Sequence, residues 1–271
     1  MSCSAIDYFI FVPAYNVENT LAKVLFKIEE SVLARARVLV IDDGSRDGTA
    51  QAFERLISEN AERAENVRNS ENAENAHDSE NAENARDLKS HFEYLKFKKN
   101  SGYGAVVKKG IAEGLASGAA FIACLHGDGQ YPAEKLGEFF AEMENRNLDL
   151  LQGSRHAVAG EAKRGGMPLY KRLGGAFLTA LENLAFREKL TDRHSGFIVY
   201  SSRFLKTVDL NRLSASFDID LELISIADAR HFAIAELPIP TRYDGEKSNL
   251  NVVTYGLRVL RQVWRRLFML R

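Results

Sequence analysis

The segment ARVLVIDDGSRDGTAQAFERLI at residues 36–57 contains the pattern that decides the fold of this chain. A continuous apolar run, RVLVI, ends at an acidic turn containing glycine, DDGSRDGT, and a helical pattern begins at Thr49. Continuous apolar strands of this kind are buried on both faces, as in a parallel sheet. The segment therefore predicts one strand–loop–helix unit of an α/β protein.

The same unit recurs along the chain. YFIFVPAYN at 8–16 predicts a strand and loop, and NTLAKVLFKIEESVLA at 19–34 has apolar positions at helical spacing. YLKF at 94–97 and AAFIACL at 119–125 predict two further strands, separated by a glycine-rich loop and a helix. Strands that alternate with helices predict a doubly wound, mostly parallel sheet. In such sheets, ligands bind beyond the carboxyl ends of the strands.

The second half of the chain continues the alternation. The predicted strands are LDLLQGSR at 148–155, HSGFIVYSS at 194–202 and AIAELPIPTRYD at 233–244. The predicted helices are PAEKLGEFFAEMENRN at 132–147, residues 166–190 and LELISIADA at 221–229.

Composition indicates an ordinary globular protein. The 271 residues are 45% hydrophobic, enough for one large domain with a full core. A net charge of −1 gives no reason to expect a nucleic-acid partner. Cys124 lies in an apolar run, where a reduced thiol is expected, and the N-terminal segment has no basic leader. We therefore expect a cytoplasmic protein without a transmembrane segment.

Residues 58–87 interrupt the pattern with a low-complexity repeat of Ala, Glu and Asn. SENAENAHD at 70–78 recurs as SENAENARD at 79–87. The repeat has almost nothing apolar to bury, which favours a solvated helical or disordered insertion without a catalytic role. The alternative is a short solenoid or binding arm.

Three polar loops follow three of the predicted strands: PAYN at 13–16, DDGS at 42–45 and HGDGQ at 126–130. Parallel strands bring such loops to one edge of the sheet. A nucleoside diphosphate-sugar would suit this edge, because carboxylates accept from the base and ribose while a divalent cation bridges the diphosphate to protein oxygens.

The motifs FVPAYNVENTL, VLVIDDGSRDGT, NSGYGAVVKKGI, HGDGQYP, GSR and SGF, in this order, resemble the family-two glycosyltransferases of GT-A fold. They are most similar to the polyprenyl-phosphate branch, of the dolichol-phosphate mannose type. The resemblance covers nearly all of residues 7–250 apart from the insertion. It implies a Rossmann-like, mostly parallel sheet flanked by helices, in a glycosyltransferase domain at 1–250. We expect a basic amphipathic helix at 251–271 to follow this domain.

The resemblance also implies donor-binding residues. Asp43 corresponds to the carboxylate that reads the base, and the glycine-rich turn would let backbone approach the donor. The full donor set is Pro13, Tyr15, Asn16, Asp43, Asn100, Gly102, Gly104, His126, Gly127, Asp128 and Arg242. Arg155 of GSR is expected to pair with phosphate and, with Asp128, to be catalytic.

HGDGQ aligns with a family loop that is commonly DADLQ, so His126 takes the position of the first Asp. Asp128 and Gln130 would then hold Mg²⁺ or Mn²⁺ together with the diphosphate and water. Three roles remain open for His126: a contact with the diphosphate, a metal ligand or a structural residue at the strand end.

The acceptor side resembles the family less closely, because Ile198 stands where these enzymes often carry arginine. Ser195, Gly196, Lys247 and Ser248 are the residues expected to bind an acceptor phosphate. A lipid phosphate needs no protein base, since its second pKa near 6 leaves it largely dianionic. A sugar hydroxyl does need one. The candidate bases are Asp192, Asp218, Asp220 and Glu222.

The tail favours the lipid. From 257 to 271, apolar residues including Leu260 and Trp264 fall on one arc of a helical wheel, opposite four arginines. Such a helix is expected to lie in the interface of an anionic membrane. The alternative is packing on the domain or on a second subunit of a homo-oligomer.

The sequence therefore predicts an inverting, metal-dependent glycosyltransferase that moves a sugar from a nucleotide donor to polyprenyl phosphate. It would associate peripherally with the inner, cytoplasmic face of the membrane. The alternatives are an enzyme of the same fold that extends a saccharide in surface glycan assembly, and a catalytically inactive module that binds nucleotide sugar.

Overall fold

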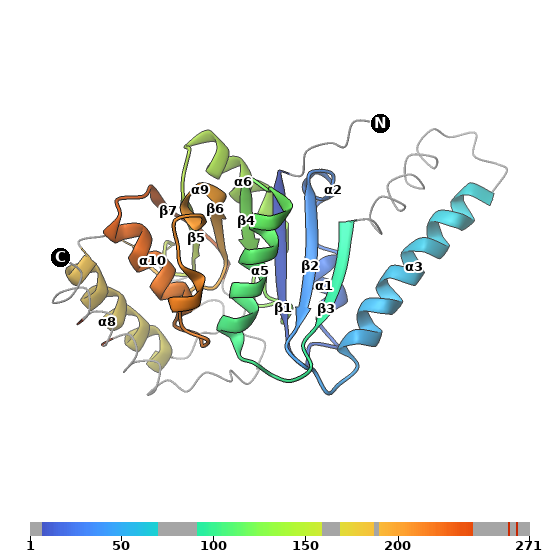
Figure 1. The fold of residues 1–271 in the computed structure, drawn as a ribbon, viewed down its shortest axis with the longest axis horizontal. Helices are drawn as coiled ribbons and strands as arrows, with labels where there is room; N and C mark the ends of the chain where they lie inside the picture. The colour runs from blue at the N-terminus through green and yellow to red at the C-terminus, as the bar shows by residue number, and fades with distance from the viewer. Residues whose placement is uncertain are drawn as a thin grey trace.

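The computed structural model of the protein describes residues 7–69, 91–158, 169–186 and 190–240, together with 260 and 264. They form a seven-stranded sheet with helices on both faces (Figure 1). The strands are β1 (Tyr8–Ala14), β2 (Ala36–Asp42), β3 (Phe92–Lys96), β4 (Phe121–Cys124), β5 (Leu150–Ser154), β6 (Ile198–Ser201) and β7 (Ile234–Pro238). The helices are α1 (Leu21–Leu25), α2 (Glu30–Leu33), α3 (Thr49–Asn69), α5 (Tyr103–Ser117), α6 (Leu136–Asn145), α8 (Leu169–Phe186), α9 (Ser202–Leu205) and α10 (Ile219–Ala229), with 3-10 turns at Ala133–Lys135 and Leu210–Arg212.

The strand order is β3-β2-β1-β4-β6-β5-β7. Only β6 runs against its neighbours, since it pairs antiparallel with both β4 and β5 while the other pairs in this sheet are parallel. Two reversals restore the original direction, so the carboxyl ends of β1, β2, β4 and β5 lie at one edge with the amino end of β6. The predicted doubly wound, mostly parallel sheet is confirmed.

The central strand β1 shows why its sequence is apolar throughout. Ile10 and Val12 point into the cluster formed with α1, α2, α3 and α6. Phe9 and Phe11 point into the opposite cluster, formed with α5, α9 and α10. All four side chains are buried. Because successive side chains of a strand alternate between faces, a strand covered on both sides has no polar position.

The apolar spacing at 19–34 predicts a single helix. The structure instead has the two short helices α1 and α2. Glu29 between them is extended, at φ −65° and ψ 142°. On a continuous helix, Leu33 would lie about 120° round the axis from Leu21. The break allows both leucines to reach the same buried cluster before the chain enters β2.

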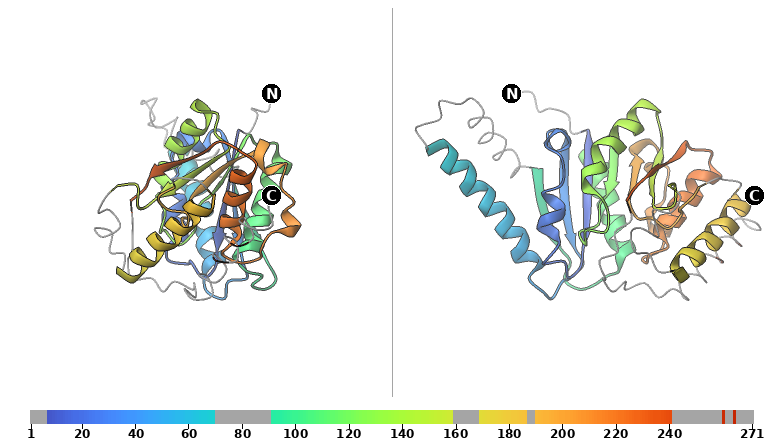
Figure 2. Two further views of the ribbon diagram at one scale, coloured as in Figure 1. Left: turned by 90° about the vertical axis from the view of Figure 1, so that its left-hand side faces the viewer. Right: turned by 180° about the vertical axis from the view of Figure 1, so that it is seen from behind.

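Helix α3 extends into the low-complexity segment. It continues to Asn69, so residues 58–69 of the insertion are helical. A helical insertion was one of the two forms that the sequence predicted, and a disordered one was the other. Figure 1 shows its second half reaching away from the edge strand β3, whereas α8 lies at the opposite end of the molecule, as the view from behind in Figure 2 also shows. Residues 70–87 of the repeat fall outside the described residues.

Candidate functional site

Direct hydrogen bonds join the loops that follow β1, β2 and β4. The backbone N–H of Asn16 donates to Oγ of Ser45 at 2.9 Å, which joins the first two loops. The backbone N–H of Gly127 donates to the carbonyl of Pro13 at 3.0 Å, and Oγ1 of Thr20 donates to the carbonyl of Gly127 at 2.8 Å. The structure therefore brings together the three loops that the sequence placed at one edge.

Asp43 links this edge to the glycine-rich turn. Its Oδ1 accepts the backbone N–H of Ser101 at 2.6 Å and its Oδ2 accepts that of Gly102 at 2.9 Å. Each carboxylate oxygen retains a second lone pair, so the predicted contact with a nucleoside base stays a prediction. The predicted donor residues Tyr15 and Asn100 are both exposed in the loops nearby.

The structure gives a different reason for the glycines of that turn. A Cβ at Gly102 would lie 2.6 Å from the carbonyl oxygen of Ala215, and Gly102 has a φ of +93°. A Cβ at Gly104 would lie 2.5 Å from the carbonyl oxygen of Ser214. Both glycines therefore permit close packing against the loop that precedes α10, whether or not a donor is bound.

Gly104→Ala is expected to destabilise the protein by about 1–3 kcal/mol, because the backbone that meets the new methyl group has to move. Gly174→Ala is the matched control. It makes the same change on α8, where a Cβ would meet nothing within 4 Å, and alanine there is expected to be neutral or stabilising. Thermal unfolding of both variants measures the difference. Equal melting temperatures would contradict the packing explanation.

Asp128 lies in a tight turn after β4. Its Oδ1 accepts the backbone N–H of Gln130 at 3.0 Å, and Gly129 between them has a φ of +79°. In the described part of the chain, no group of three His, Cys, Asp or Glu side chains is arranged to hold a metal. The loop offers one carboxylate, one amide and one imidazole. This donor set fits a divalent cation whose remaining ligands are diphosphate oxygens and water.

His126 is hydrogen-bonded within the protein. Its Nε2 lies 3.1 Å from the hydroxyl oxygen of Tyr103, and that hydroxyl donates to Oδ2 of Asp220 at 2.8 Å. The ring packs edge-on against Tyr131, with 5.0 Å between centroids. Burial is the main cause that lowers the pKa of His126 from its usual 6.5, so the imidazole is neutral at physiological pH.

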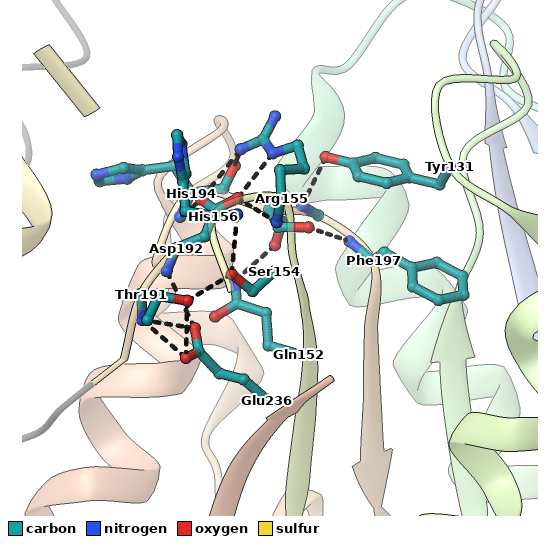
Figure 3. A network of polar contacts seen from close by, with 12 residues as sticks. Tyr131, Gln152, Ser154, Arg155, His156, Thr191, Asp192, His194, Phe197 and Glu236 are labelled. Atoms are coloured by element: carbon teal, nitrogen blue, oxygen red, sulfur yellow. Dashed lines mark hydrogen bonds and ion pairs between the residues drawn. The ribbon is translucent and has the colours of Figure 1, made fainter. Parts of the chain in front are cut away.

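Arg155 pairs with Asp192, as Figure 3 shows. Its Nε donates to Oδ2 of Asp192 at 2.7 Å, and a terminal nitrogen donates to Oδ1 at 3.1 Å and to the carbonyl of His194 at 3.1 Å. Burial would raise the pKa of Asp192, but the Arg155 charge and hydrogen bonds outweigh it and lower that pKa to about 2. The predicted phosphate contact of Arg155 stays a prediction. Its observed partner is a protein carboxylate.

Glu236 on β7 holds the segment that carries Asp192 by hydrogen bonds to its backbone. Both carboxylate oxygens of Glu236 accept the backbone N–H of Thr191, at 2.7 and 2.8 Å, and one accepts that of Asp192 at 3.0 Å (Figure 3). The hydroxyl of Thr191 also lies 2.6 Å from that of Ser154. Sequence reasoning missed Thr191 and Glu236, because neither belongs to a motif and 45 residues separate them.

The Gly196 amide has a partner within the protein, and its predicted contact with a phosphate stays a prediction. That N–H donates to the hydroxyl of Tyr131 at 2.8 Å, and Ser195 is 1% exposed. The cause is the β4–β6 pairing, which places Gly196 against His126: a Cβ on Gly196 would lie 2.6 Å from the His126 Nε2. Tyr131 of HGDGQYP is thus a third residue that sequence reasoning missed.

The other candidate bases also have partners in the protein. Asp218 accepts from the hydroxyl of Ser214 at 2.7 Å, and Glu222 accepts the backbone N–H of Ser214 at 2.6 Å. Asp192 is held by Arg155, and Asp220 by Tyr103. Each of the four candidate bases therefore has a partner within the protein, and their proposed role stays a prediction.

Several expectations fall outside the described residues. They concern Arg242, Lys247, Ser248 and most of the tail at 251–271. Leu260 and Trp264 are the described residues of the tail, and both are exposed. Among the helices that the structure describes, none combines the length and apolarity needed to cross a bilayer.

The fold and the loops at its carboxyl edge define the class of GT-A glycosyltransferases. A model of the family described as glycosyl transferase family 2 matches residues 9–76 and 72–209. The chain belongs to this family and is a glycosyltransferase that uses a nucleotide sugar.

Individual relatives agree with this class. The chain is 24% identical to the UDP-N-acetylglucosamine–dolichyl-phosphate N-acetylglucosaminyltransferase of Methanococcus voltae, over 87% of this chain and 85% of the relative. It is 22% identical to the polyprenol monophosphomannose synthase of Mycolicibacterium smegmatis, over 85% and 75% respectively. Among solved structures, glucosyl-3-phosphoglycerate synthase of Mycobacterium tuberculosis, in complex with Mn²⁺, UDP and glucosyl-3-phosphoglycerate, has a TM-score of 0.62 at 13% identity, covering 96% of this chain and 79% of that one.

Proposed function

We propose that this protein transfers a sugar from a nucleoside diphosphate-sugar to polyprenyl phosphate, with inversion at the anomeric carbon. It would act as a peripheral protein on the inner, cytoplasmic face of the membrane. The names of the relatives from Methanococcus voltae and Mycolicibacterium smegmatis support a polyprenyl-phosphate acceptor.

The observation that carries the lipid acceptor is an exposed apolar stripe on α8. The stripe comprises Leu169, Leu173, Phe177 and Leu184, which are 60%, 62%, 68% and 80% exposed. At about 100° per residue, these four positions fall within an arc of about 80° on one face of the helix. A contiguous exposed apolar face on a protein surface marks an interaction site.

Helix α8 is connected to the candidate site. Nδ2 of Asn183 on α8 donates to the carbonyl of Leu190 at 2.6 Å, and Nε of Arg193 donates to Oδ1 of Asn183 at 3.1 Å. Leu190 and Arg193 flank Asp192, the partner of Arg155. A membrane seated on the stripe would therefore bring lipid phosphates close to the loop that borders the site.

The pairing of Asp192 with Arg155 also supports a phosphate acceptor. A phosphate oxygen attacks the anomeric carbon as the bond to the diphosphate breaks, and a nucleoside diphosphate leaves. The attacking dianion has no proton to lose, so positioning and charge neutralisation suffice. Asp192, with its pKa near 2, would be a weak base for a sugar hydroxyl.

Asp128 and Gln130 would hold Mg²⁺ or Mn²⁺ at the donor diphosphate, and structural neighbours bound to Mn²⁺ or Mg²⁺ with UDP support such a cofactor. When bound, this cation neutralises charge on the leaving group. The protein loops orient the diphosphate and exclude water from the anomeric carbon.

A donor screen with the purified protein tests the proposal. Candidate nucleotide sugars are incubated with undecaprenyl phosphate and, separately, with oligosaccharide acceptors. The expected result is a glycosylated polyprenyl phosphate of inverted anomeric configuration. Product from oligosaccharides alone would favour saccharide extension, and nucleotide binding without any product would favour an inactive module.

The double variant Leu173→Glu/Phe177→Glu is expected to weaken association with anionic vesicles at least 10-fold, because it places two charges within the apolar stripe. Gln51→Glu/Glu54→Gln changes exposed positions on α3, at the opposite end of the molecule, and should bind as the unaltered protein does. Vesicle co-sedimentation provides the measurement. Undiminished binding of the α8 variant would remove the stripe as the membrane contact.

A further inference from the structure

His126 belongs to a partly buried chain of polar groups that extends away from the loop edge. We call His126, Tyr103 and Asp220 the relay. Its members come from the loop after β4, the first residue of α5 and the first turn of α10. Tyr103 stacks on Phe217 at 5.2 Å between centroids, and Tyr200 donates a longer hydrogen bond of 3.5 Å to Oδ1 of Asp220. The relay thus connects the loop after β4 with the first turns of α5 and α10.

Proton accounting along the relay determines the tautomer of His126. A tyrosine hydroxyl carries one proton, and Tyr103 donates it to Asp220. The Tyr103 oxygen must then accept from His126, so Nε2 carries the imidazole proton. Because the ring is neutral, Nδ1 is left with a lone pair.

The ionised form of Asp220 fixes this direction of donation, because a carboxylate can only accept hydrogen bonds. Burial, the largest effect, raises the pKa of Asp220 to about 7, while hydrogen bonds from Tyr103 and Tyr200 favour the carboxylate. At pH 8 the carboxylate therefore predominates. Under that condition, hydrogen bonds along the relay are donated in a single direction, from the imidazole to the hydroxyl and from the hydroxyl to the carboxylate.

The surroundings of His126 fix the ring but leave Nδ1 for a ligand. The close approach of Gly196 to Nε2 and the edge contact with Tyr131 restrict the ring. His126 is partly exposed, and within the described residues no group forms a hydrogen bond to Nδ1. His126, which carries this Nδ1 lone pair, lies in the loop after β4, two residues before Asp128.

We infer that Tyr103 and Asp220 are positioning residues, which hold His126 in the Nε2–H form so that Nδ1 supplies a lone pair to the cation accompanying the donor. This inference rests on the proposed function. Histidine ligands of metals commonly donate their second N–H to a carboxylate or another acceptor, and this fixes the tautomer and raises the basicity of the ligand. A nitrogen ligand favours a transition ion, so the site should prefer Mn²⁺ to Mg²⁺ more strongly than a two-carboxylate loop does.

The tautomer is tested directly on the unaltered full chain. At pH 8 and without added metal, ¹⁵N NMR is expected to show His126 protonated at Nε2 and not at Nδ1. The His126→Gln variant assigns its signals among the six histidines. Protonation at Nδ1 would overturn the inference, whatever the activity of the protein.

Metal affinity tests the positioning role. Titration of Mn²⁺ in the presence of UDP, followed by electron paramagnetic resonance, is expected to show a 10- to 100-fold weaker Mn²⁺ affinity in Tyr103→Phe and Asp220→Asn. Mg²⁺ affinity should change less than about 3-fold, so the preference for Mn²⁺ falls. Tyr200→Phe is the control, because it removes a hydroxyl from Asp220 without touching Tyr103 or His126, and it should retain the Mn²⁺ affinity.

Failure of the relay and failure of the proposed function give different results. Wild-type Mn²⁺ affinity in folded Tyr103→Phe, with binding lost in Asp128→Ala, would overturn the relay and leave the metal-dependent transferase intact. Circular dichroism establishes that each variant is folded. If a variant does not fold, the ¹⁵N measurement on the unaltered chain still decides the tautomer on which the inference depends.

Discussion

Asp128→Ala is expected to lower kcat/KM for sugar transfer by at least about 100-fold and to abolish metal-dependent binding of the nucleoside diphosphate. Asp128 is the single carboxylate of HGDGQ, and in the described residues no cluster of three potential ligands supplies a replacement. Loss of one group that stabilises charge developing on the leaving diphosphate costs about 10²–10³ in rate. Calorimetry with nucleoside diphosphate, with and without Mn²⁺, measures the binding part.

Glu138→Ala provides the matched control for Asp128→Ala. Glu138 lies on the outside of α6, where it pairs with Lys135, and its loss removes a carboxylate from the same segment of chain. It should leave both kcat/KM and nucleotide affinity within about 2-fold. Metal-independent nucleotide binding that survives Asp128→Ala would contradict the proposed cofactor and favour an inactive binding module.

The sheet could be predicted because its signals are local. Each apolar run followed by a polar, glycine-containing turn specifies a strand end, and parallel pairing of β1, β2 and β4 then brings Asn16, Asp43 and Asp128 to one edge. The reversed direction of β6 could not be predicted in this way. It depends on the path of the chain between β5 and β6, which no periodicity encodes.

The contacts within the site could not be predicted, because they depend on side chains that are distant in sequence. Arg155 and Asp192 are 37 residues apart, and Tyr103 and Asp220 are 117 apart. A motif identifies one partner of each pair and says nothing of the other. Sequence reasoning therefore named Arg155 and Asp192 for separate roles and could not show that the two side chains form an ion pair.

The pairing of Arg155 with Asp192 makes a second prediction, which concerns stability. Arg155→Met is expected to lower the free energy of unfolding by about 3–5 kcal/mol, because it leaves the Asp192 carboxylate, which is 1% exposed, without its counter-charge. Arg155→Met/Asp192→Leu removes both charges and should recover most of that loss. Denaturant unfolding at pH 7 gives the three free energies, and a small effect of the single change would show that water solvates the carboxylate.

The pH dependence of stability has a defined sign for this pair. The pKa of Asp192 is about 2 in the folded protein, below its ordinary value of 3.8, so the folded state binds this proton less readily than the unfolded state. The resulting stabilisation, about 2 kcal/mol, is present above pH 4 and is lost as the pH falls from about 4 to 2. In Arg155→Met, the charge and side-chain hydrogen bonds of residue 155 no longer oppose burial, so the folded pKa of Asp192 rises and the loss of stability between pH 4 and 2 becomes smaller.

The double variant also separates the two roles open to Arg155. If Arg155 acts only by holding the 190–196 loop against the sheet, the variant that recovers stability should also recover kcat/KM. If Arg155 also contacts donor or acceptor phosphate, stability returns while kcat/KM remains at least 10-fold lower, since methionine offers no donor to an anion. We expect the second result. In the unaltered protein, Asp192 holds the Arg155 guanidinium at the edge where Asp128 and His126 lie, and the charge of Arg155 contributes to the lowered pKa of His126.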